Sequence, residues 1–113
     1  MSNVIDLVLS DSRKIKHLFI YESYEFLNNV KIESLKNLSK QNIKFKDLGS
    51  RVIMDDRIID FSFDGDNYNK LIGNRYRVIN VYAKLSVGNK KFVESLLEDV
   101  STSNIMYLGR NNK

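Results

Sequence analysis

The pattern of apolar and polar residues predicts two strands near the start of the chain. Residues 4–9 combine aliphatic and β-branched side chains, and residues 14–22 alternate between two sets that would point to opposite faces of a sheet. The polar residues 10–13 between them predict a turn. We expect the second strand to lead into a helical turn at residues 23–27, because the apolar residues there also fit a helical spacing.

A short amphipathic helix is predicted over residues 29–40. Its apolar residues recur at every third position, at Ile32, Leu35 and Leu38. An asparagine side chain can accept a hydrogen bond from the first free amides of a helix, so an N-cap is predicted at residues 28–29, Asn-Asn.

The middle of the chain predicts a hairpin. Residues 43–45 and 50–54 have the composition of strands, and the dipeptide Asp55-Asp56 separates the second of these from the apolar run 57–63. A further turn is predicted at residues 64–67, where aspartate, glycine and asparagine gather.

The regular alternation over residues 76–87 predicts the longest strand of the fold. Gly88 and Asn89 then open a predicted helix over residues 90–100, and a last strand is expected over 104–108, before a polar tail at 109–113. These elements predict one α+β domain over residues 1–113, with an antiparallel or mixed sheet of five to six strands and two helices packed on one face.

Charge is unevenly distributed along the sequence. The chain of 113 residues has a net charge of +4, and residues 31–51 alone account for that excess, whereas residues 55–66 carry a local charge of −4. Thirteen asparagines and twelve lysines, against one alanine and no proline, indicate an A/T-rich coding sequence. We therefore expect an origin in a low-GC bacterium, or in a phage, virus or mobile element.

The composition removes several kinds of chemistry. The chain has no cysteine, and His17 is its only histidine, so a disulfide framework, a thiol nucleophile and a zinc site of several Cys or His ligands are excluded. His17 lies in an alternating strand and is expected to be buried or at an edge. No catalytic residue, cofactor or bound metal is predicted, and without a long apolar run or a secretion signal we expect a cytoplasmic protein with no membrane contact.

The first functional interpretation is a non-enzymatic binding module that acts on another protein. Inhibitor, immunity factor and virion component all fit this class. Exposed tyrosine and arginine side chains are enriched at the centres of interfaces, and the predicted contact residues are Tyr68, Arg75, Tyr76, Arg77 and Tyr82. Association between copies of the chain is also expected, because the long strand over residues 76–87 would offer a sheet edge.

Two further interpretations use other residues. A DNA- or RNA-binding domain would place basic side chains on phosphates, and those predicted to do so are Lys36, Lys40, Lys44, Lys46 and Arg51. A small metal-dependent enzyme is the third interpretation, with carboxylates around a cation and a nearby lysine, drawn from Asp60, Asp64, Asp66 and Lys84. The spacing around Asp64 departs from that of a helix-loop-helix calcium site.

Overall fold

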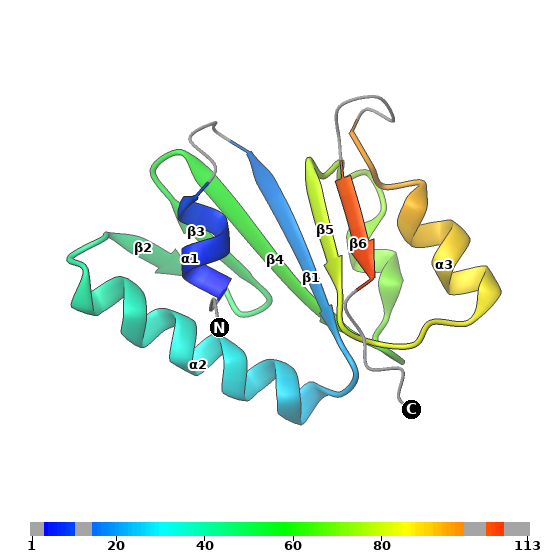
Figure 1. Ribbon diagram of the computed structural model, residues 1–113, viewed down its shortest axis with the longest axis horizontal. Coiled ribbons are helices and arrows are strands. Elements are labelled where there is room, and N and C mark those ends of the chain that lie inside the picture. Colours follow the sequence, from blue (N-terminus) through cyan, green and yellow to red (C-terminus); the bar gives the residue numbers. More distant parts are fainter. Residues whose placement is uncertain (1–3, 11–14, 99–103, 108–113) are drawn as a thin grey trace.

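The computed structural model describes residues 4–10, 15–98 and 104–107, which form a mixed β-sheet with helices on both sides (Figure 1). The helices are α1 (Val4–Leu9), α2 (Tyr24–Lys40) and α3 (Val87–Glu94), together with a short 3-10 helix, η1 (Tyr68–Leu71). The strands are β1 (Lys16–Tyr21), β2 (Phe45–Asp47), β3 (Arg51–Met54), β4 (Arg57–Phe63), β5 (Val78–Val81) and β6 (Asn104–Tyr107).

The six strands lie in the order β2-β3-β4-β1-β5-β6. Strand β1 is parallel to both of its neighbours, β4 and β5, and β6 is parallel to β5, whereas β2 and β3 form an antiparallel extension on the other side. The predicted α+β class and the mixed sheet are therefore confirmed. Since β1, β4 and β5 run in the same direction, their first residues lie side by side at one end of the strands. We call this end of the sheet the amino edge.

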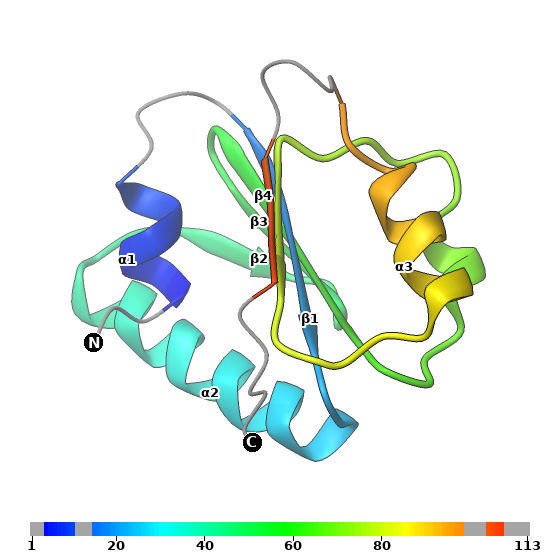
Figure 2. The same ribbon diagram turned by 45° about the vertical axis from the view of Figure 1, so that its right-hand side comes forward.

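Both faces of β1 are buried, and this requires a helical layer on each side of the sheet. Helices α1 and α2 lie on one side of the sheet and α3 on the other (Figure 2). His17, Phe19 and Tyr21 face α1 and α2, whereas Leu18 and Ile20 face η1 and α3. Central parallel strands are usually covered on both faces. The prediction that the helices pack on a single face is therefore wrong, because the residues read as the outer face of β1 are themselves apolar.

Residues 4–9 form helix α1, although a strand was predicted there. Val4, Ile5 and Val8 are buried, and this spacing places them on one side of a helix turned toward α2 and the sheet. Packing of that apolar side outweighs the weak strand preference of β-branched residues. The predicted turn at residues 10–13 falls largely on positions outside the described residues.

Helix α2 begins earlier than predicted, and it faces the sheet with a different set of residues. The Oγ of Ser23, in place of an asparagine at 28–29, accepts the hydrogen bond from the amide of Phe26, at 3.2 Å. Leu27 and Leu38 are buried, but Ile32 is 45% exposed. A strict three-residue spacing drifts around a helix of 3.6 residues per turn, so it cannot mark a single buried face.

The strand predicted over residues 76–87 is much shorter in the structure. Strand β5 ends at Val81, although the amide of Tyr82 still bonds to the carbonyl of Ile20, at 2.7 Å. Helix α3 starts at Val87, where the Ser86 side chain caps it. Because β5 lies between β1 and β6, it offers no free edge, and association between copies stays a prediction without this support.

Two of the remaining local predictions are confirmed. The hairpin is confirmed, with Met54 opposite Arg57 across the Asp55-Asp56 turn. The last strand is confirmed as β6, and the polar tail at 109–113 lies outside the described residues. The predicted helix over 90–100 corresponds to α3 in its first half.

The buried side of α2 can be tested with a matched pair of variants. Leu38→Ala is expected to lower the free energy of unfolding by about 2–5 kcal/mol, because Leu38 is fully buried. Ile32→Ala is expected to change it by no more than about 0.5 kcal/mol, because Ile32 faces solvent. Urea unfolding followed by circular dichroism measures both, and equal losses would contradict this orientation of the helix.

Candidate functional site

Part of the sheet has no helix over it among the described residues. On the α3 side, η1 and α3 pack against β1 and β5, through residues that include Leu71, Val93 and Leu96. The register of β2, β3 and β4 places a further set of side chains on the same side of the sheet. No described helix covers this surface. We call this surface the open face, and it consists of Lys46, Arg51, Ile53, Ile58 and Asp60.

A partly buried ion pair lies on the open face. Asp60 is on β4, and its side chain is only 7% exposed, whereas that of Arg51 on β3 is 33% exposed. Arg51 donates from Nε to Oδ1 of Asp60 at 2.7 Å and from Nη2 to Oδ2 at 2.8 Å. This two-point geometry is the strongest form of an arginine–carboxylate contact. The hydroxyl of Tyr76 donates to the same Oδ2, at 2.5 Å.

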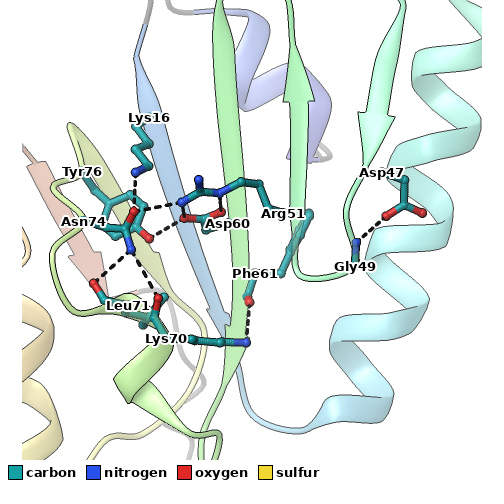
Figure 3. A network of polar contacts seen from close by, with 10 residues as sticks. All are labelled: Lys16, Asp47, Gly49, Arg51, Asp60, Phe61, Lys70, Leu71, Asn74 and Tyr76. Carbon is teal, nitrogen blue, oxygen red and sulfur yellow. Dashed lines mark hydrogen bonds and ion pairs between the residues drawn. The ribbon is translucent and has the colours of Figure 1, made fainter.

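Asn74 ties the loop between η1 and β5 to this ion pair (Figure 3). Its side-chain amide donates to the carbonyls of Lys70 and Leu71, at the end of η1. The amide nitrogen is therefore turned toward the 3-10 helix, and Oδ1 is turned toward the cations. That oxygen accepts from Nζ of Lys16 at 2.5 Å and from Nη2 of Arg51 at 2.9 Å.

The electrostatics of the network favour a protonated tyrosine and a less basic lysine. Burial raises the pKa of Tyr76, and the hydrogen bond to Asp60 raises it further, so the phenol remains a donor at neutral pH. Burial also lowers the pKa of Lys16, and repulsion from Arg51 adds to this, whereas Asp60 acts in the opposite direction. Nζ of Lys16 also lies 5.3 Å from the ring centroid of Tyr76.

A cleft of about 470 Å³ adjoins the network at the amino edge. Its apolar lining includes Ile53 and Ile58 of the open face, and Lys16 lies between the cleft and the ion pair. The full lining is Ile15, Lys16, Ile53, Met54, Asp55, Asp56, Arg57, Ile58, Arg75 and Glu98. Arg57 is engaged with Asp56, at 3.4 Å, and with the carbonyl of Val8.

Three of the predicted partner-binding residues lie near this cleft, but one of them is not exposed. Tyr76 is fully buried, so the expectation of an exposed contact residue is wrong there. Its backbone amide donates to the carbonyl of Leu96, and its backbone carbonyl accepts from the amide of Glu98. Arg75 is exposed and lines the cleft, whereas Arg77 is half-buried.

Tyr68 and Tyr82 lie away from the amino edge. Tyr68 stacks on Phe92 with ring centroids 5.9 Å apart, and burial, followed by the charges of Asp64 and Asp66, raises its pKa to about 12. Tyr82 stacks on Tyr21 beyond the last residue of β5. The five predicted partner-binding residues therefore do not form one surface.

The network contains Lys16 and Asn74, which the sequence analysis did not single out, and Asp60 and Arg51, to which it gave other roles. A signal for one of them was present. Asp60 stands in an otherwise apolar run, and a carboxylate that is buried in a strand needs a cation or several hydrogen-bond donors.

The predicted nucleic-acid residues are divided between two sides of the sheet. Lys36 and Lys40 lie on the outward side of α2, beside Ile32. Lys46 belongs to the open face, and Lys44 is exposed. Arg51 is bound to Asp60, as described above. Residues 31–51 therefore do not present one continuous basic surface, and contact of these lysines with nucleic acid stays a prediction.

The carboxylates that were predicted to hold a metal ion do not form one site, because Asp60 and Asp66 bind different partners. Asp66 contacts Nζ of Lys70 at 2.5 Å and the hydroxyl of Ser62 at 2.8 Å, whereas Asp64 is exposed. Within residues 4–10, 15–98 and 104–107, no three Asp, Glu or His side chains lie close enough together to hold a metal ion. His17 is 2% exposed, as expected for a core histidine.

No protein-family model, curated protein or solved structure matches the chain. The site is therefore interpreted from its own geometry and charge. Among the described helices, none is both long enough and apolar enough to cross a membrane.

Loss of the central carboxylate is expected to weaken the fold. Asp60→Asn leaves Arg51 without an anion, and we expect the free energy of unfolding to fall by about 2–4 kcal/mol, somewhat less than for a fully buried pair because Arg51 reaches solvent. Asp64→Asn, in an exposed turn, is the control and should change it by less than about 0.5 kcal/mol. Urea unfolding at pH 7 measures the difference, and similar values for both variants would contradict the role of Asp60.

The Asp66–Lys70 pair predicts a dependence of stability on pH. Burial alone would raise the pKa of Asp66, but hydrogen bonds from Lys70, Ser62 and the Asn67 amide outweigh it, so the pKa is lowered. A lowered pKa stabilises the fold above the unfolded-state value, and this contribution is lost as pH falls through the folded-state value.

Asp66→Asn should therefore be less stable than the wild type at pH 7, and the gap should shrink as the pH falls below about 4, the unfolded-state pKa of an aspartate. Lys70→Met should show the same trend, because it removes the cation of the same pair. Thermal unfolding across this pH range is the measurement. A gap that stays constant with pH would show that the charge of Asp66 is not what stabilises the fold.

Proposed function

We propose that the protein is a non-enzymatic binding module that captures another protein on its open face. The observation that supports this most directly is the part of the α3 side that no described helix covers, where the half-buried Ile53 and Ile58 form an apolar floor. Lys46 belongs to the same surface, and Lys16 and Arg75 line the adjoining cleft.

An uncovered apolar floor is unusual in a layered fold. A sheet gains stability when a second layer buries each of its apolar faces, and here the described helices cover only part of the α3 side. Apolar surface that is bordered by polar groups is typical of interaction sites. A partner that covers Ile53 and Ile58 would supply the missing layer.

The surface is also held rigidly before any partner arrives. Arg51 and Asp60 join β3 to β4, and the contacts of Tyr76 and Asn74 fasten the η1–β5 loop to the same pair. A surface that is already ordered loses less conformational entropy on binding, which favours affinity. The network therefore suits a docking platform.

The role and the origin expected for this protein indicate the class of its partner. An inhibitor, an immunity factor or a virion component of a phage or a low-GC bacterium acts by occupying the surface of another protein, within the cytoplasm of the host cell. Each of these roles needs a stable contact surface and no reactive side chain. The open face has these properties, because Ile53 and Ile58 give it an apolar floor, Lys46 lies on the same surface, and the carboxylate of Asp60 is already bound by Arg51 and Tyr76.

Capture from lysate of the native host, with nuclease treatment, tests the proposal. The wild type should recover a specific protein, and Lys46→Glu and Ile53→Glu should each reduce recovery at least about tenfold, because they place charge on the surface to be buried. Ile32→Glu, on the outward side of α2, is the matched control and should leave recovery unchanged.

Circular dichroism confirms that each variant is folded. The proposal would be wrong if the wild type recovers no protein at low salt, or if recovery survives both open-face variants. It would also be wrong if the captured material disappears on nuclease treatment, since this would indicate that nucleic acid carries the contact.

A further inference from the structure

The network beside the cleft has more hydrogen-bond donors than acceptors. The two carboxylate oxygens of Asp60 accept from Arg51 and Tyr76. The cations Lys16 and Arg51 then share a single remaining acceptor, Oδ1 of Asn74. An ammonium group has three donors, and Lys16 uses one of them in this contact. The site can therefore accommodate another acceptor.

The charges in the network are unbalanced in the same sense. Lys16 and Arg51 are two cations and Asp60 is one carboxylate, whereas Asn74 and Tyr76 are neutral. Lys16 is half-buried, yet the group that accepts its hydrogen bond is an amide oxygen and not an anion. Burial and the nearby guanidinium of Arg51 also lower the pKa of Lys16.

We propose that Lys16 binds a carboxylate of the partner protein, an aspartate or glutamate side chain that enters the cleft at the amino edge. This rests on the proposed function and specifies the chemistry that the open face recognises. Lys16 lines the cleft, so a carboxylate there can accept from its ammonium group. Arg75 lines the same cleft and adds a second exposed cation.

The surroundings favour one carboxylate on an apolar segment over a strand of phosphates. Asp55 and Glu98 are exposed and line the same cleft, where they would repel a chain of negative charges. The floor is made of isoleucine, and the lining contains no aromatic ring on which a base could stack. An acidic residue flanked by aliphatic side chains matches both the charge and the floor.

The test uses two blocked tripeptides, acetyl-Ile-Asp-Ile-amide and its Asn analogue, with isotope-labelled protein in NMR titrations at low salt. The Asp peptide should shift the side-chain signals of Lys16 and Asn74, and the Asn peptide should bind at least about tenfold more weakly, because it lacks the charge. The pKa of Lys16, followed through its Cε signal, should rise when the Asp peptide is bound, since an anion favours the charged form.

A matched pair of lysine variants shows whether the effect belongs to this site. Lys16→Met should abolish the preference for the Asp peptide, whereas Lys84→Met, an exposed lysine outside the cleft, should preserve it. Single-stranded oligo(dT) is the third probe. If it shifts Lys16 and displaces the Asp peptide, the site recognises phosphate and the proposal is wrong.

Equal binding of the two tripeptides, or no shift at Lys16 with either, would also overturn the proposal. These outcomes are separate from the test of the binding module. Partner capture that depends on Lys46 and Ile53 but accompanies equal tripeptide binding would retain the protein-binding function and reject only the carboxylate site. If neither partner capture nor the preference for the Asp tripeptide is observed, both the protein-binding function and the carboxylate site are rejected.

Discussion

The ion pair between Arg51 and Asp60 is the contact on which the arrangement of this protein depends. A carboxylate in the middle of a strand is costly to bury, and only the two-point contact with Arg51 and the hydroxyl of Tyr76 makes that position acceptable. A shift of β3 by one residue would turn Arg51 to the other face of the sheet, so the pair also sets the register of the hairpin.

The same pair explains why the sheet is covered unevenly. Helix α3 and η1 lie over Leu18 and Ile79, where the face is apolar, whereas Asp60 occupies the matching position on the next strand. A helix that extended over Asp60 would bury the exposed part of Arg51 and remove its access to water. The limit of the helical layer therefore follows from the charge, and the open face is its consequence.

Local features could be predicted from the sequence, and features decided by distant contacts could not. The hairpin followed from the Asp55-Asp56 turn between two apolar runs, and β6 from its own composition. Helix α1 was missed because its buried stripe depends on packing against α2. The site was missed for the same reason, since Asp60 meets Arg51 and Tyr76, which are 9 and 16 residues away, and Asn74 meets Lys16 across 58 residues.

Lys16 differs from the other members of the network in the contacts that it makes. Asp60 accepts hydrogen bonds from Arg51 and Tyr76, and Asn74 is held by its bonds to the end of η1, so neither of them requires Lys16 as a donor. The ammonium of Lys16 donates one bond to an oxygen that Arg51 already occupies and lies near the ring of Tyr76, and it is repelled by Arg51 and attracted by Asp60. A half-buried ammonium that is not required to complete the hydrogen bonds of Asp60 and Asn74, and that lies close to a like charge beside a cleft, is the feature on which our proposal of an external carboxylate rests.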